Sequence, residues 1–447
     1  MKAGFSRIEI TPSLGCSLAG DYNKHHAEGF ITGLYANAVA FSDGETTVCT
    51  VSLDLLEMPK YNMDKFRKYI ADRTGLPYDA LYIQCIHTHL GPDVGGFLFE
   101  IDQSYFNVLC GKVSDAVTLA LRDMKDAKAY ISRTTAEGIS AIRRYRMKDG
   151  TIKMNPGASP DALEPIGTPD HTVQLVRITR EGASDIAIVN FQTHPDVISG
   201  DPNCYNLVCH DWPGFTRKYL EAALSDVADG KGVNAIVFNG TQGDTNQITD
   251  RFNARKQMGL EHSKFMGRKL AGAVMSIYTY GDEVNSEKVF YGYKPTYATP
   301  KKAKTAEELA EAKRIYDIFQ KCEGLRKGKE FIGENALART AQAVKYVRLE
   351  NAPDKYELGV CEVGFGDVVF VGFPGEPFTE IGRTVKENSP FAMTIPSCNT
   401  NGSEGYFSMR ADIEGGVGYE AMSARFEAGV SEDLIECALE LAKELKG

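Results

Sequence analysis

Long hydrophobic runs, an excess of basic residues and paired cysteines are all missing from this sequence of 447 residues. No stretch of about eighteen apolar residues occurs, which excludes a membrane-spanning helix. The net charge is −10, so no basic stripe is present that would bind a nucleic-acid backbone or an anionic lipid surface. The N-terminal segment also lacks the apolar core of a signal peptide.

The ten cysteines form no C-x-x-C pair and show no zinc-finger spacing. Several of them, such as Cys49 and Cys361, lie within apolar runs, where a free thiol behaves as a small hydrophobic side chain. Unpaired and buried thiols are typical of a reducing compartment. We therefore expect a cytoplasmic protein, whose oligomeric state the composition leaves open.

Apolar runs of strand length alternate with segments of helical period over most of the chain. This alternation predicts an α/β fold in which mixed β-sheets are flanked by helices. No repeat, low-complexity tract or linker divides the sequence, so we predict one large catalytic domain over residues 1–447. Residues 301–346 are charged and helix-forming and predict a helical insertion of two helices. The insertion is either a lid over the core or, as its charge favours, a solvated hairpin without a chemical role.

Local signals predict particular elements within this pattern. The Asp43-Gly44 dipeptide between two apolar runs predicts a hairpin. A helix is expected over residues 62–72, closed by Gly75, and another over residues 431–446. Residues 399–418 are rich in glycine and predict a loop.

Four strand-like apolar runs each lead into a side chain suited to metal binding or catalysis, namely His87, His194, Asp244 and Glu376. Active sites of open α/β sheets gather beyond the carboxyl ends of strands. Two histidines, a carboxylate and an open position form a common catalytic zinc site. Alone, the H-x-H pair of His87 and His89 fits a metal site or two structural histidines equally well. Together, the two histidine segments favour one shared site.

Five short motifs resemble those of the neutral (non-lysosomal) ceramidases, in the same order along the chain. CIHTHLGPDVGG resembles the family's THTHSGP, NFQTHPDVISGD its second histidine segment, and FPGEPFTEIGR its PGEFT motif. GTQGDTNQ stands in the place of NxGDVSPN, and GYFSM with GYEAM is similar to the paired tyrosine segments. The resemblance covers the N-terminal catalytic domain, over roughly residues 4–425, and leaves no room for the C-terminal β-sandwich of longer ceramidases.

The resemblance implies a catalytic zinc ion, Zn²⁺, bound by His87, His194, Glu376 and Tyr406. It also implies that two further residues, His89 and Tyr419, polarise the amide carbonyl or manage protons. Arg143 is similar to the family's active-site arginine, and its neighbour in the RRYR run, Arg144, is the alternative. The implied substrate is ceramide, which would place the protein in sphingolipid metabolism.

The serine of the family's GDVSPN motif is absent, and Asn246 occupies its position after Asp244 and Thr245. Asparagine cannot act as a nucleophile, but its amide can donate to an oxyanion, so we predict a catalytic role for Asn246. Asp244 and Thr245 are predicted to bind substrate, and Asp244 could also hold a ligand histidine in its tautomer. The substitution favours a substrate smaller or more polar than ceramide.

The sequence thus predicts a zinc-dependent amidohydrolase that cleaves a linear N-acyl bond, in ceramide or a smaller compound, through a zinc-bound hydroxide. The expected partner is a small-molecule or lipid substrate, not a nucleic acid. One alternative is hydrolysis of an ester or phosphoester, for which Asp54, Asp211 and Asp244 would supply ligands to a second metal. The other is a non-catalytic descendant that binds a ligand in the same pocket.

Overall fold

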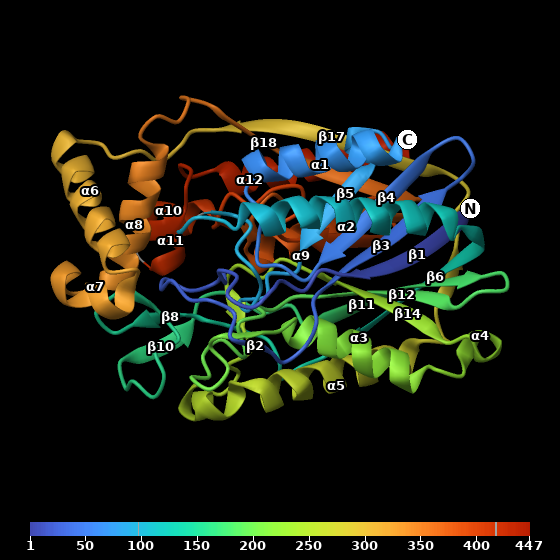
Figure 1. Ribbon diagram of the computed structural model, residues 1–447, viewed down its shortest axis with the longest axis horizontal. Coiled ribbons are helices and arrows are strands. Elements are labelled where there is room, and N and C mark those ends of the chain that lie inside the picture. Colours follow the sequence, from blue (N-terminus) through green and yellow to red (C-terminus); the bar gives the residue numbers. More distant parts are fainter. Residues whose placement is uncertain (97, 416–417) are drawn as a thin grey trace.

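A long mixed sheet runs through the molecule in a computed structural model that describes residues 1–96, 98–415 and 418–447 (Figure 1). Its strand order is β14-β12-β11-β6-β1-β3-β4-β5, and β16 pairs with β6. Only β4–β5 and β12–β14 are parallel pairs. The strands are β1 (Lys2–Glu9), β3 (Tyr35–Ser42), β4 (Thr47–Leu53), β5 (Leu81–Cys85), β6 (Lys125–Thr135), β11 (Thr172–Arg180), β12 (Asp185–Phe191), β14 (Val233–Asn239) and β16 (Asp282–Val284).

A second sheet packs its inner face against both halves of the first. It contains β17 (Val289–Ala298), β18 (Tyr356–Phe365), β19 (Val368–Gly372) and β21 (Met393–Ser397). Buried aromatic side chains of both sheets meet in this core, with Phe41 and Phe365 at 4.9 Å and Phe238 and Phe370 at 5.6 Å between ring centroids. The central core is therefore made mainly between the two β-sheets.

Helices cover the outer faces of the sheets (Figure 1). The face of β1, β3, β4 and β5 is covered by α1 (Lys60–Thr74) and α2 (Gln103–Arg122). The face of β11, β12 and β14 is covered by α3 (Asp211–Ala223) and α5 (Leu260–Ile277). The second sheet is covered by α9 (Thr379–Asn388) and α12 (Val430–Lys446). The predicted α/β fold of mixed sheets flanked by helices is confirmed.

The local signals act as expected. At the β3–β4 turn, Asp43 Oδ1 accepts the backbone N–H groups of Glu45 (2.9 Å) and Thr46 (2.7 Å). Helix α1 ends at Gly75, whose φ of 76° is left-handed and whose N–H donates to the Ala71 carbonyl at 2.9 Å. The hairpin and both predicted helices are therefore confirmed, with α1 and α12 slightly longer than expected.

The predicted insertion differs from the expectation in the number of its helices and in how it packs against the rest of the molecule. It contains three helices, α6 (Ala306–Lys321), α7 (Leu325–Ile332) and α8 (Ala336–Leu349), because Gly324 and Gly333 break the helical pattern at φ of 128° and 88°. Helix α8 packs against α11 (Tyr419–Ser423), and Phe319 of α6 contacts the ring of Tyr22. The insertion is thus packed on the core, and the prediction of a solvated hairpin was wrong.

Short elements complete the chain. The predicted glycine-rich loop contains a two-residue strand and a helix, while its residues 416–417 lie outside the described part. The short elements are β2 (Gly29–Phe30), β7 (Ala141–Ile142), β8 (Arg144–Met147), β9 (Ile152–Met154), β10 (Ala162–Pro165), β13 (Leu207–Val208), β15 (Thr245–Asn246), β20 (Glu376–Pro377), β22 (Tyr406–Phe407), α4 (Val227–Gly230) and α10 (Arg410–Gly415).

All ten cysteines are free thiols, and all but Cys322 are buried. None of the helices in the described residues has both the length and the apolar character needed to cross a bilayer.

Candidate metal centre

Three histidines from two distant segments meet beyond the ends of β5 and β12. One ring nitrogen from each of His87, His89 and His194 lies within 4.8 Å of the other two, so this group could hold a metal ion. The rings of His87 and His194 cross at right angles, with centroids 4.7 Å apart. His87 has a φ of 76°, a left-handed conformation that costs a non-glycine residue about 1–3 kcal/mol. Such strain, held at a candidate ligand, is typical of functional sites.

Backbone carbonyls decide the tautomer of all three rings. Each Nδ1 lies within hydrogen-bonding distance of a carbonyl oxygen, which can only accept, so Nδ1 carries the proton and Nε2 keeps its lone pair. The carbonyls facing His87, His89 and His194 belong to Leu56, Gly20 and Gln242, at 3.1, 2.7 and 3.1 Å. The amide of Asn399 also lies 2.9 Å from His87 Nδ1, and because an amide can turn either end to the ring, the carbonyl decides the tautomer.

Glu376 brings a carboxylate to the lone pairs of His87 and His194. Its Oε2 lies 3.2 Å from His87 Nε2 and 3.3 Å from His194 Nε2. Two ligands held about 2.0–2.1 Å from a tetrahedral zinc ion lie roughly 3.3 Å from each other. The spacing and the chemistry of these donors therefore fit zinc.

Burial and the mutual contacts set the charges of the group. Burial lowers the pKa of His89 to about 3 and that of His194 well below its usual value. Burial acts in the same direction on His87, but its contacts with Glu376, Glu57 and the Leu56 carbonyl together outweigh burial and raise the pKa of that ring. Burial tends to raise the pKa of Glu376, but His87, Arg143 and His89 together outweigh burial and lower this pKa. His89 and His194 are thus neutral near pH 7, the form that binds metals.

Tyr406 reaches the group from β22, which pairs with β20 so that Tyr406 stands directly beside Glu376. Arg143 Nη2 donates to the Tyr406 hydroxyl at 3.1 Å and to the Gly243 carbonyl at 3.0 Å, while its Nε donates to Glu420 at 2.8 Å. This arginine places positive charge beside the Tyr406 oxygen.

The structure also separates the two adjacent arginines of the RRYR run. Arg144 turns away to Asp412, at 2.6 Å, and its guanidinium lies 4.8 Å from the ring centroid of Phe378. Arg143 is therefore the arginine that faces the metal-binding group.

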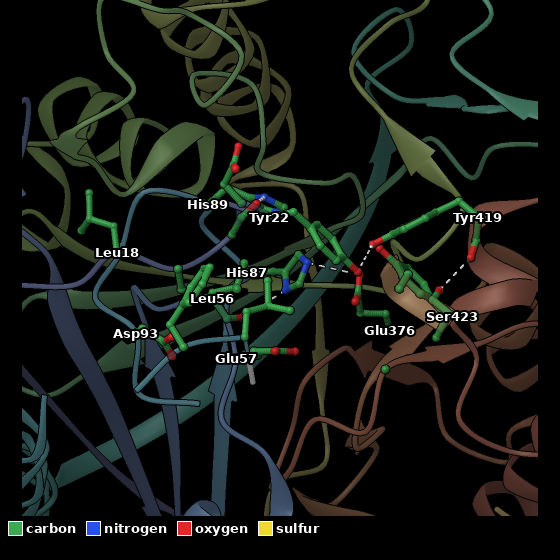
Figure 2. A pocket seen from close by; sticks show the side chains of 18 of the residues that line it. Leu18, Tyr22, Leu56, Glu57, His87, His89, Asp93, Glu376, Tyr419 and Ser423 are labelled. Carbon is green, nitrogen blue, oxygen red and sulfur yellow. Dashed lines mark hydrogen bonds and ion pairs between the residues drawn. The ribbon is translucent and has the colours of Figure 1, made fainter. Parts of the chain in front are cut away.

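Tyr419 contacts a residue that the sequence analysis did not single out as functional. Its hydroxyl lies 3.2 Å from that of Tyr22, in the LAGDYN segment, and its ring centroid is 5.8 Å from that of Tyr406 (Figure 2). The small residues of this segment are a weak sequence signal for a close approach of its backbone: Gly20 has a φ of 100°, and a Cβ atom there would lie 2.7 Å from His89 Cα. The loop can therefore approach His89 only with glycine at this position.

A cavity of about 120 Å³ adjoins the group. It is lined by His87, His89, Glu376, Tyr406, Tyr419 and Tyr22, and also by Glu57, which the sequence analysis missed (Figure 2). Ala341 of α8 lines the same cavity, so the helical insertion contributes to its wall. Five of the sequence-predicted residues thus share one cavity.

The GTQGDTNQ segment lies outside this wall. Asp244 Oδ1 accepts the N–H (2.8 Å) and the hydroxyl (2.7 Å) of Thr379 at the start of α9, so it does not hold a ligand histidine. Asn246 donates to Asn155 at 2.8 Å, and Thr245 is fully buried. Within the described residues, none of the three lines the cavity. Their predicted contacts with substrate stay predictions.

The carboxylates considered for a second metal have other partners. Asp54 accepts two hydrogen bonds from Arg217, at 2.9 and 2.6 Å. Asp211 accepts from the Val197 N–H at 3.0 Å and from the Ser263 hydroxyl. With Asp244 held by α9, none of these carboxylates is placed as the two-metal alternative requires.

Comparisons with known proteins agree with this geometry at the level of the fold. No protein-family model matches the sequence, and neither does any curated protein. The crystal structure of neutral ceramidase from Pseudomonas aeruginosa matches with a TM-score of 0.70 and 15% identity, over 100% of this chain and 75% of that one. A ceramidase complexed with C2 matches with a TM-score of 0.68 and 14% identity, over 99% and 75%. The predicted resemblance is therefore confirmed as a ceramidase-like fold.

Proposed function

We propose that this protein is a zinc-dependent hydrolase that cleaves a linear amide, the N-acyl bond of a small molecule. The observation that carries the proposal is the approach of His87 Nε2 and His194 Nε2 to one Glu376 oxygen, at 3.2 and 3.3 Å, beside a cavity. The ceramidase-like fold supports an amide as the bond that is cleaved.

In this proposal His87, His194, Glu376 and Tyr406 hold the zinc ion. When bound there, zinc supplies a Lewis acid for the amide carbonyl and lowers the pKa of a bound water towards neutrality. The carbonyls that hold the Nδ1 protons keep the ligand rings in the tautomer that binds a metal.

In this proposal His89 acts on the substrate as a hydrogen-bond acceptor and Tyr419 as a hydrogen-bond donor. His89 Nδ1–H donates a hydrogen bond to the Gly20 carbonyl, so His89 Nε2 can only accept, from the attacking water or from the amide N–H. The two tyrosine hydroxyls lie 3.2 Å apart, and in this proposal Tyr22 is the donor, so that the Tyr419 hydroxyl proton serves the developing negative charge on the carbonyl oxygen.

The volume of the cavity favours a small acyl group over a long fatty chain. A dry cavity of about 150 Å³ in another protein holds one benzene molecule, and the cavity here is about 120 Å³. We therefore propose a compact N-acyl compound as the substrate in place of ceramide.

Metal content and amide hydrolysis test this function together. We expect about one zinc per chain in the wild type, with release of the amine from N-acyl substrates. The His87→Ala, His194→Ala double variant should lose both, while His26→Ala, which removes an exposed histidine, should lose neither. A wild-type protein without metal after incubation with zinc would refute the proposal.

A further inference from the structure

Glu57 lines the cavity next to the metal-binding group (Figure 2). It directly follows Leu56, whose carbonyl lies 3.1 Å from His87 Nδ1. The same turn of backbone therefore holds a metal ligand with one residue and places a carboxylate on the cavity wall with the next.

One oxygen of this carboxylate is held by the protein. The Ser403 hydroxyl lies 2.7 Å from Glu57 Oε2 and 3.0 Å from Asn399 Oδ1, which fixes the side chain against the loop after β21. Across the part of the chain that the structure describes, no hydrogen bond reaches Oε1. Glu57 thus presents a positioned and unused acceptor to the cavity.

Carboxylates outnumber the cationic side chains among the residues that line the cavity. Two other carboxylates, Asp21 and Asp93, also line it. Arg425 lines the cavity too and pairs with Glu404, while Lys345 and Arg348 donate to the Met422 and Gly96 carbonyls. Burial raises the pKa of the Glu57 carboxyl, and nearby Glu376 adds to this effect. A cationic ligand beside Glu57 would offset both the cost of burying this carboxylate and its repulsion by Glu376.

We propose that Glu57 selects substrates that carry an ammonium group near the scissile amide, such as a short diamine acylated on one nitrogen. This inference rests on the proposed function. The carboxylate accepts a charge-assisted hydrogen bond from the ammonium, which orients the amide towards Glu376 and the histidines. In the reaction the oxygen of water joins the acyl carbon, the C–N bond breaks, and a proton from water passes to the leaving nitrogen.

A matched pair of substrates tests the selection. N-(3-aminopropyl)acetamide and N-butylacetamide have the same length and differ in an ammonium against a methyl group. We expect the wild type to favour the ammonium compound by roughly ten- to hundredfold in kcat/KM. In Glu57→Gln the preference should fall to about one, because the amide lacks the charge. Glu45→Gln, which removes an exposed carboxylate in the β3–β4 turn, should keep the full preference.

Zinc affinity separates selection from a positioning role. Glu57 is linked through Ser403 and Asn399 to His87, so a purely positioning residue would weaken zinc binding when substituted. Selection predicts unchanged zinc affinity in Glu57→Gln. Loss of zinc together with loss of both hydrolyses would overturn the inference, and so would a preference that survives the substitution.

Failure of the proposed function would look different. A wild type that cleaves both amides equally would keep the function and refute the selection by Glu57. If the wild type cleaves neither, the binding of 1,3-diaminopropane and of butylamine to the zinc-loaded protein decides the inference. Tighter binding of the diamine that depends on Glu57 would support it, and equal binding would overturn it.

Discussion

Arg143 Nη2 donates to the Tyr406 hydroxyl at 3.1 Å, across 263 positions of sequence. The same guanidinium holds Glu420, which is 1% exposed, and so joins the β7–β8 connection to β22 and α11. The contact links the metal-binding group to the helix that carries Tyr419. It makes Arg143 important to stability as well as to the site.

Substitution of Arg143 tests this link. Arg143→Met leaves the Glu420 carboxylate buried with only Arg144 nearby, at 3.8 Å, and should cost about 3 kcal/mol of unfolding free energy. Arg146→Met, which removes a half-exposed arginine from β8, should cost less than about 0.5 kcal/mol. Urea denaturation measures both. Equal midpoints for the two variants would show that the buried pair does not stabilise the fold.

Zinc should stabilise the folded protein, because its ligands come together only in the native state. At a free concentration of one hundred times Kd, binding adds about 2.7 kcal/mol. For a chain of 447 residues this raises Tm by about 3 °C. A chelator should reverse the shift in differential scanning fluorimetry. The His87→Ala, His194→Ala variant should show no shift, and a shift of wild-type size there would place the zinc elsewhere.

The two tyrosine hydroxyls should differ in their effect on catalysis. Tyr419→Phe removes the donor to the carbonyl oxygen and should lower kcat by roughly 10²–10³ with little change in KM. Tyr22→Phe removes only the orienting hydroxyl and should lower kcat by about tenfold or less. Tyr82→Phe removes a buried hydroxyl that does not line the cavity and should leave kcat unchanged. A Tyr419→Phe enzyme with full kcat would exclude this donor role.

Glu362 should make stability depend on pH. It lies on β18 opposite Gly292, under Leu441 of α12, with no hydrogen bond to either carboxylate oxygen. Burial raises its pKa well above the usual value, so the folded chain keeps a proton that the unfolded chain loses above about pH 4.5. Stability is therefore lost as pH rises from there, by about 1.4 kcal/mol per unit, until the folded pKa is reached.

Glu362→Met removes the loss of stability that this buried carboxyl causes as the pH rises. Its gain in unfolding free energy over the wild type should be larger at pH 7 than at pH 5, measured in chelator so that zinc does not contribute. Glu357→Gln, on an exposed position of the same strand, should show no such difference. A gain independent of pH would mean that Glu362 is ionised in the folded protein.

The sequence predicted more of the fold than of the site. The β3–β4 hairpin and helix α1 follow from Asp43, Gly44 and Gly75, whose effects are confined to neighbouring residues. The insertion was misjudged because its contacts, such as Phe319 with Tyr22, join segments far apart in the chain. The polar residues that follow the strand-like runs predicted the metal-binding group, but neither this pattern nor the motifs indicated a role for Glu57.

By itself, the sequence determined the strands, the helices and the segments that carry His87, His194 and Glu376, because periodicity and turn residues act locally. Only the tertiary structure decided which tautomer each histidine adopts, since the carbonyls of Leu56, Gly20 and Gln242 belong to the backbone and have no signature in the sequence. It also decided that Asp244 holds α9 and that Glu57 faces the cavity. Those contacts depend on how distant loops meet, which local propensities do not encode.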